Sequence, residues 1–367
     1  MSAVISYKKQ TIFGIMLILL GFSIVEGLAR SSIYFEPPCL FMDSDAYATH
    51  GYEYKREMCY DNINYIWSIH PSLSLKPDQH FETININEYG FRGPEITKEK
   101  QEDTYRIILI GGSTAFAGSS DEATIAGYLQ KEFDKKNPEL KVEIINAGII
   151  NAFSFTETNY VKEKLIEFKP DMIIAYNGIN DLLKSYDSHN NVWSDNVIKE
   201  RIANVVRENY KFWNTPVVIR YILQVEIPNE INKNNVIPFD DEKIDEKVEL
   251  WKNRWLEVCD LGNKNKTKTL VILQPMLGTS NRDLGEYEKQ LYNQLDNERY
   301  FNAYQKYANN LDSLSESCAD SHDFRNIFNN VSDSLYYDKY HVGDKGNKIL
   351  AEQIHEIALS KIEVLDN

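Results

Sequence analysis

A run of apolar, mostly β-branched residues, Ile107–Ile110, ends at Gly111 and Gly112, and Ser113 follows directly. Continuous apolarity over a few residues predicts a strand that is buried on both faces, as in a parallel sheet. Open α/β sheets bind their ligands at the carboxyl ends of the strands. We therefore expect Ser113 at the edge where a site would form, as a nucleophile, a helix-capping residue or a phosphate contact.

Three more apolar runs follow the first, and helical segments separate them. The predicted strands are Val142–Asn146, Asp171–Tyr176 and Thr269–Leu273, and the predicted helices include Asp121–Phe133, Ser154–Phe168, Glu242–Asp260 and Asp344–Ile362. The Ser154-Phe-Thr-Glu157 pattern fits a capping box at the start of the second helix. Strands that alternate with helices imply right-handed crossovers and parallel pairing. We therefore predict a three-layer α/β/α sandwich with a parallel, flavodoxin-like sheet over residues 104–367.

The first 30 residues have the pattern of a membrane-directed segment. Lys8 and Lys9 precede the apolar run Thr11–Val25, and Glu26 follows it. An uncleaved anchor needs about 20 apolar residues, whereas a cleaved signal peptide needs a shorter run and small residues at the cut. A buried core helix is the third interpretation. We expect a cytoplasmic stub and a transmembrane helix, with the main domain outside the cytoplasm; secretion after cleavage is the alternative.

Residues 31–103 are aromatic, interrupted by prolines and poor in helical periodicity. Short strands are predicted at His70–Pro77 and Phe81–Glu88, before a turn at Tyr89–Pro94. We expect an irregular, partly β lead-in outside the cytoplasm that packs on the main domain and is not an independent fold. Arg92 is expected in a surface or structural ion pair, in preference to a contact with a substrate carboxylate or phosphate.

Charge and cysteine content limit the partners and the compartment. The formal net charge is −15, and no basic patch is present that would neutralise phosphates, so nucleic-acid binding is excluded. The four cysteines contain no CxxC pair. Outside the cytoplasm, proximity in sequence favours the pairs Cys39–Cys59 and Cys259–Cys318 among three possible pairings. Four unpaired thiols are the alternative.

Polar residues follow the predicted strands and precede the last helix in a pattern that fits acyl transfer. This chemistry needs a nucleophile, a base, a group that orients the base, and donors for the developing oxyanion. Ser113 can attack when His341 takes its proton, and Asp338 can hold the imidazole in the required tautomer. The backbone N–H groups of Ser113 and Gly148 and the side-chain amide of Asn180 can act as oxyanion donors.

The four blocks Gly111–Thr114, Asn146–Gly148, Gly178–Asp181 and Asp338–His341 occur in this order. Together they resemble the SGNH (GDSL-type) hydrolases, in particular the membrane-anchored, extracytoplasmic members. The resemblance implies a catalytic triad of Ser113, His341 and Asp338, and an oxyanion hole of Ser113, Gly148 and Asn180. One position departs from the family pattern, because Gly112 precedes the serine where the family often has aspartate.

Metal and nucleotide chemistry are the competing interpretations of these motifs. Asp338 and His341, with Asp181 as a third ligand, could bind zinc or manganese, but no HExxH motif or second clustered histidine supports this. Gly111-Gly-Ser-Thr114 lacks the GxGxxG spacing and the P-loop lysine that nucleotide sites require. We therefore expect neither a metal nor a cofactor.

The sequence therefore predicts a membrane-anchored serine esterase or acyl hydrolase whose substrates are O-acyl esters of surface glycans. An O-acyltransferase that uses the same site on envelope polysaccharide is one alternative. A catalytically silent glycan-binding or assembly protein on the same scaffold is another. A polar, proline-bounded loop, Ile227–Pro238, has the length to cover the site.

Overall fold

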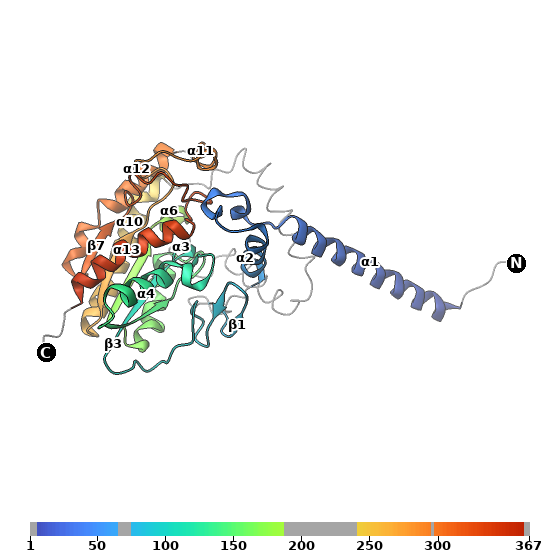
Figure 1. Cartoon of the computed structure of the whole chain (residues 1–367), viewed down its shortest axis with the longest axis horizontal. Coiled ribbons are helices and arrows are strands. Elements are labelled where there is room, and N and C mark those ends of the chain that lie inside the picture. Colours follow the sequence, from blue (N-terminus) through green and yellow to red (C-terminus); the bar gives the residue numbers. More distant parts are fainter. Residues whose placement is uncertain (1–5, 65–74, 187–240, 295–296, 363–367) are drawn as a thin grey trace. The chain divides into compact units, whose positions relative to one another are not determined.

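The computed structural model describes residues 6–64, 75–186, 241–294 and 297–362 (Figure 1). The chain divides into two compact units. One includes the residues up to Cys39, and the sheet belongs to the other, which begins at Leu40. The loop Ile227–Pro238, whose length would allow it to cover the site, lies outside the described residues.

Helix α1 (Tyr7–Phe35) contains a stretch, Tyr7–Ser32, that is long and apolar enough to cross a membrane. These 26 residues extend about 39 Å at a rise of about 1.5 Å per residue, more than the hydrocarbon thickness of about 30 Å. Its apolar side chains are exposed all around the helix. Glu26 forms an ion pair with Arg30, one turn further on. A membrane anchor or a signal sequence has this composition, and the helix extends beyond the predicted end at Arg30.

The second unit is built on a five-stranded sheet in the order β4-β3-β5-β6-β7. Its strands are β3 (Thr104–Gly111), β4 (Lys141–Asn146), β5 (Met172–Asn177), β6 (Lys268–Leu273) and β7 (Asp320–Asp323), and every pair is parallel. In this order β4, the second strand of the sheet along the chain, lies at the edge next to β3, the first, and the later strands lie on the other side of β3; this is the flavodoxin-like arrangement. The predicted fold class is confirmed. Gly111 pairs with Tyr176, and Asn177 pairs with Leu273, so the carboxyl ends of β3, β5 and β6 meet at one edge.

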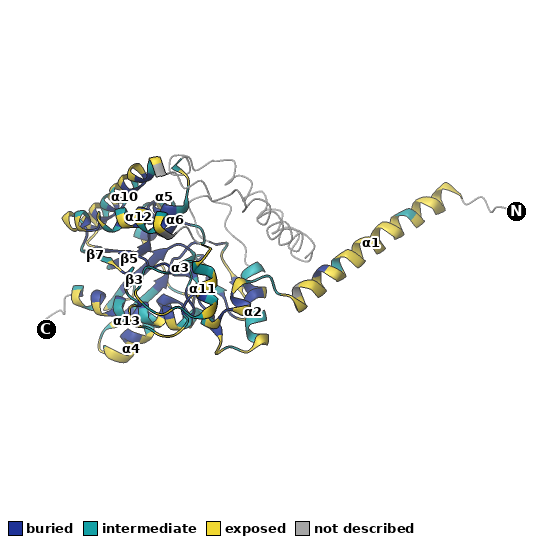
Figure 2. Ribbon diagram, turned by 90° about the horizontal axis from the view of Figure 1, so that it is seen from above, coloured by how far each residue is buried: buried dark blue, intermediate teal, exposed yellow. Residues whose placement is uncertain are grey.

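Helices cover both faces of the sheet (Figure 1), and alternate residues of β3 contact the two layers. Ile107 and Leu109 belong to the same core as α4 (Ile125–Lys136) and α13 (Asp344–Lys361). Ile108 and Ile110 belong to the opposite core, with α5 (Ser154–Glu163), α10 (Ile244–Lys264) and α12 (Asn297–Ala308). Figure 2 shows the buried strands between these helices, whose outer faces are exposed.

Two details of the α/β part differ from the sequence prediction. Strand β7 was not expected, because its residues Asp-Ser-His-Asp are polar. Among the described strands it pairs with β6 alone, at the edge of the sheet. The expected capping role of Ser154 is wrong. Phe153 occupies the N-cap position and its N–H donates to Thr156 Oγ1 at 3.0 Å, while the Ser154 hydroxyl donates to Asp181.

The lead-in contains more helix than its sequence suggested. Two short 3-10 helices, Leu40–Asp43 and Asp45–Tyr47, precede a 13-residue helix, α2 (Tyr52–Asn64). Most of the strand predicted at His70–Pro77 lies outside the described residues, and the strand predicted at Phe81–Glu88 is reduced to β2 (Asn85–Ile86), which pairs with β1 (Gln79–His80). Asp61 of α2 accepts hydrogen bonds from the N–H and hydroxyl of Thr83, which fastens α2 to the β1–β2 hairpin. Tertiary contacts thus stabilise a helix that has no clear apolar stripe.

The cysteines are paired. A disulfide joins Cys259 of α10 to Cys318, just before β7, which confirms that predicted pair. Cys39 and Cys59 are disulfide-bonded as well. The alternative of four free thiols is therefore wrong.

Candidate active site

Ser113 is the first residue of a short helix, α3 (Ser113–Phe116), directly after β3. Gly112 is its N-cap, and a Cβ atom at this position would lie 2.5 Å from Asn180 Nδ2 and 3.2 Å from Ala152 O. Any side chain at residue 112 would therefore displace Asn180. This contact explains why glycine precedes the serine in this chain.

Ser113, His341 and Asp338 form a continuous chain of hydrogen bonds. His341 Nε2 lies 2.6 Å from Ser113 Oγ, and His341 Nδ1 lies 2.7 Å from Asp338 Oδ2. The other carboxylate oxygen, Asp338 Oδ1, accepts the N–H groups of Tyr340 at 2.8 Å and His341 at 2.7 Å. These distances are those required of a nucleophile, its base and the group that orients the base.

The two ionisable partners stabilise each other's charged form. Burial lowers the pKa of His341, but the charge of Asp338 and its hydrogen bond outweigh burial, so the pKa lies above its ordinary value. Burial raises the pKa of Asp338, but the His341 charge and hydrogen bond, with two backbone N–H groups, lower it overall. Asp338 is therefore ionised at neutral pH, and an imidazolium formed at His341 is stabilised.

Asn180 lies beside the serine, whereas the N–H of Gly148 has another partner. Asn180 is in α6 (Ile179–Leu183), and its Nδ2 donates to Ala152 O at 2.6 Å, which leaves its second N–H for another acceptor. The Gly148 N–H donates to Asn146 Oδ1 at 3.0 Å. A Cβ at Gly148 would lie 2.6 Å from Phe116 N. In this geometry the N–H of Gly148, the predicted oxyanion donor, is therefore occupied by Asn146, and the glycine allows close packing against α3.

Asn151 was not singled out in the sequence, although it lies in the turn that reaches the site. Its φ angle is 64°, in the left-handed region. The turn is closed by the Ala152 N–H, which donates to Ile149 O at 3.0 Å. The Asn151 N–H donates to no acceptor among the described residues. Asparagine tolerates a positive φ angle better than most residues. The residue type at position 151 was therefore the one feature of the sequence that could have indicated this turn.

Asp181 joins the helix that carries Asn180 to the start of α5. It is buried and accepts the N–H of Ser154 at 3.0 Å as well as the Ser154 hydroxyl, which ties α6 to the start of α5. Burial raises the pKa of Asp181, and burial and then the Asp181 charge raise the pKa of the neighbouring Glu157 carboxyl well above its ordinary value. Within the described ranges, no group of three His, Cys, Asp or Glu residues is arranged to hold a metal.

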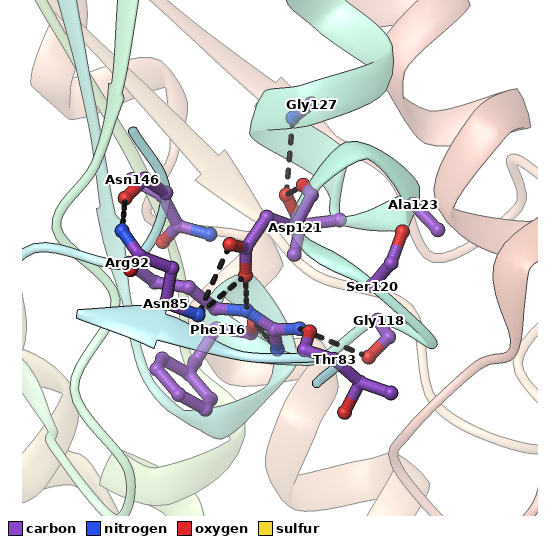
Figure 3. Close-up of polar contacts among 12 residues, drawn as sticks. Thr83, Asn85, Arg92, Phe116, Gly118, Ser120, Asp121, Ala123, Gly127 and Asn146 are labelled. Atoms are coloured by element: carbon purple, nitrogen blue, oxygen red, sulfur yellow. Dashed lines mark hydrogen bonds and ion pairs between the residues drawn. The ribbon is translucent and has the colours of Figure 1, made fainter. Parts of the chain in front are cut away.

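Arg92 contacts the last residue of α3, Phe116, and the loop that follows it (Figure 3). Its side chain is 1% exposed, and its Nε donates to Asp121 Oδ1 at 2.8 Å. The two terminal nitrogens donate to the carbonyls of Phe116, Thr83 and Gly118, at 2.9, 3.1 and 3.3 Å. The predicted structural ion pair is confirmed, and it links the lead-in to both ends of the loop after Ser113.

No family model and no curated protein matches this sequence. Solved structures that are similar to it include an acetyl xylan esterase, AlAXEase, at 16% identity and a TM-score of 0.40, over 69% of this chain and 98% of that one. An acetyl-xylooligosaccharide esterase mutant from Geobacillus stearothermophilus has 15% identity and a TM-score of 0.43, over 72% and 97%. A GDSL-like lipase from Parabacteroides merdae has 12% identity and a TM-score of 0.41, over 70% of this chain and 96% of that one. These TM-scores are below 0.5, so the proposals below rest on the site itself.

Proposed function

We propose that this protein is a serine ester hydrolase with Ser113 as its nucleophile. The observation that carries the proposal is the unbroken sequence of hydrogen bonds from Asp338 through His341 to the Ser113 hydroxyl. A serine hydroxyl becomes an effective nucleophile only when a base accepts its proton in the attack. Asp338 fixes the tautomer in which Nδ1 carries the proton and Nε2 is free to accept one.

The reaction has two steps. In the first, Ser113 Oγ attacks the ester carbonyl while its proton passes to His341 Nε2, and the imidazolium then protonates the departing alcohol. In the second, water attacks the acyl-serine and gives its proton to His341, which returns it to Ser113 Oγ as the free acid leaves. Asp338 remains ionised throughout and stabilises the imidazolium in both steps.

The oxyanion would be held by three N–H groups from three separate segments of the chain: the start of α3, the turn at Asn151 and α6. The Ser113 N–H lies in the first turn of α3, where backbone donors have no partner within the helix. The second Nδ2 hydrogen of Asn180 is a further donor. We assign the third position to the Asn151 N–H in place of Gly148. Losing one such donor typically costs about 3–4 kcal/mol of transition-state stabilisation.

The proposed substrates are O-acyl esters of glycans at the cell surface. An apolar segment long enough to anchor the chain and a disulfide between Cys259 and Cys318 support a domain outside the cytoplasm, because disulfides persist in oxidising compartments. An O-acyltransferase would use the same acyl-serine and replace water with a sugar hydroxyl. A silent binding protein has no need for an imidazole 2.6 Å from a serine hydroxyl.

Covalent labelling with a fluorophosphonate tests the nucleophile directly. The wild-type protein is expected to be labelled and Ser113→Ala is not, whereas the matched control Ser120→Ala retains labelling. Folding of each variant is checked by its thermal melting curve. Equal labelling of wild type and Ser113→Ala, or no labelling of folded wild type, would refute the proposal.

Product analysis separates the hydrolase from the transferase. The protein is incubated with an acetyl ester donor and increasing concentrations of an oligosaccharide acceptor. Free acetate as the sole product at every acceptor concentration supports the hydrolase. Acetylated oligosaccharide that increases with acceptor concentration supports the transferase.

A further inference from the structure

The imidazole of His341 stacks on the ring of Tyr337. The two ring centroids lie 5.5 Å apart and the planes differ by 16°. Tyr337 in turn contacts two aromatic residues of the lead-in, Tyr47 at 5.5 Å and Phe41 at 5.8 Å. A row of aromatic rings therefore connects the start of the lead-in to the proposed catalytic base.

The backbone around this row is fastened at several points. Ser44 Oγ donates to Tyr336 O at 3.3 Å. Gly343 lies so close to Ala46 O that a Cβ at residue 343 would collide with it. The hydroxyl of Tyr287, in α11 (Glu286–Tyr292), lies within hydrogen-bond distance of two carbonyl acceptors, Leu40 O at 3.2 Å and Tyr337 O at 3.1 Å, and its single hydrogen can serve either. The loop that carries Asp338 and His341 is thus held against the 3-10 helices of the lead-in.

These contacts belong to the interior of the molecule. Phe41 is 8% exposed and Tyr47 is 2% exposed. Just beyond them, His50 Nε2 lies 2.8 Å from Asp344 Oδ2, at the start of the helix that follows His341. The 3-10 helices of residues 40–47 are therefore packed into the structure next to the loop that carries His341.

We propose that residues 40–47 of the lead-in take part in catalysis through Tyr337, a positioning residue that sets the plane of the His341 ring. The inference rests on the proposed function, because it concerns what fixes the orientation of the catalytic base of that site. Tyr337 acts through His341, and Phe41 and Tyr47 act through Tyr337.

The physical reason is that one hydrogen bond leaves the imidazole free to tilt. Asp338 holds Nδ1, and the ring can still swing about this contact and move Nε2 away from Ser113 Oγ. A flat ring on one face, itself fixed by two buried aromatic residues, removes this freedom. Misplacement of a reacting group by about 1 Å can cost about 100-fold in rate, so we expect Tyr337→Ala to lower kcat by about 10- to 100-fold.

The test uses the full-length protein and compares four variants. Tyr337→Ala and Phe41→Ala remove the stack and its support, and Tyr337→Phe restores a flat ring. Tyr60→Ala is the matched control, because Tyr60 lies in the lead-in helix α2 and is 46% exposed. The measurements are kcat and KM for a p-nitrophenyl ester, the rate of fluorophosphonate labelling, the melting temperature, and the NMR shifts of the His341 ring protons.

Tyr337→Ala and Phe41→Ala are expected to lower kcat and the labelling rate with little change in KM. Tyr337→Phe should recover most of the activity, and Tyr60→Ala should match wild type. Loss of the ring current should also move the His341 ring signals in Tyr337→Ala. If folded Tyr337→Ala keeps wild-type kcat, or Tyr337→Phe fails to restore it, the positioning role is refuted while Ser113 chemistry stands. A wild-type protein without Ser113-dependent labelling refutes the proposed function and this role with it.

Discussion

Replacing Asp338 with asparagine should reverse the tautomer of His341. Asp338 Oδ1 accepts two backbone N–H groups, while Oδ2 accepts, among the described residues, the His341 Nδ1–H alone. In Asp338→Asn the single amide oxygen can face either the two backbone N–H groups or His341 Nδ1, but not both. Keeping two backbone hydrogen bonds is favoured over keeping one, because a buried unpaired N–H costs about 1–3 kcal/mol. The amide nitrogen would then face His341 Nδ1.

An N–H donor at this position requires His341 Nδ1 to act as the acceptor. The ring proton then resides on Nε2, which can no longer take the proton of Ser113. The corresponding change in a serine protease triad lowers kcat by about 10⁴-fold, or about 5.4 kcal/mol at 1.36 kcal/mol per tenfold. The overall fold should be preserved, since asparagine has the same shape and both backbone bonds remain.

The assay is steady-state hydrolysis of a p-nitrophenyl ester at pH 8, with the melting temperature as the control for folding. Asp338→Asn should lose about 10⁴-fold in kcat with a melting temperature close to wild type. Asp338→Ala serves as a comparison that removes all the carboxylate contacts. A folded Asp338→Asn protein within tenfold of wild-type kcat would show that Asp338 does not orient the base.

Three further outcomes follow from the structure. The pKa of His341 is raised above its ordinary value, about 6.5, and only the neutral imidazole is a base, so kcat/KM should fall as the pH drops through that raised pKa. In Asp338→Asn the acid limb of the pH profile should move to lower pH. If the limb does not move, it belongs to another ionisable group. Asn180→Ala should lower kcat by about 10²–10³-fold, the effect of losing one oxyanion donor, and an effect confined to KM would contradict that role. Arg92→Met should lower the free energy of unfolding by about 3–5 kcal/mol, since it leaves Asp121 without its buried partner. Chemical denaturation measures this free energy. A decrease of less than about 1 kcal/mol would show that the ion pair is not needed for stability.

The framework of the second unit followed from local sequence patterns. Each predicted central strand is an apolar run bounded by turn residues, and such a run has few other stable environments than a covered parallel sheet. The order of the strands then placed Ser113 and Asn180 at one edge. Asp338 and His341 are three residues apart, so their contact is a short-range property of the loop.

Other features were not visible because the sequence carries no local signal for them. Strand β7 is polar, and it is a strand only because β6 offers an unpaired edge. Helix α2 is fixed by contacts such as Asp61 with Thr83. Ser154 has the composition of a cap, but its hydroxyl donates to Asp181, 27 positions further along the chain.

The sequence by itself thus determined the parallel α/β framework and the serine, histidine and aspartate that meet at Ser113, and it favoured the Cys259–Cys318 pair that the structure contains. The tertiary structure alone decided which donors are free in that site and what holds its base in place. Motifs record residue types and spacing, whereas the direction of an N–H group and the neighbour of a ring depend on distant packing. For that reason Gly148 matched the motif while its N–H is taken by Asn146, and Tyr337 stacks on His341 through contacts with residues almost 300 positions away.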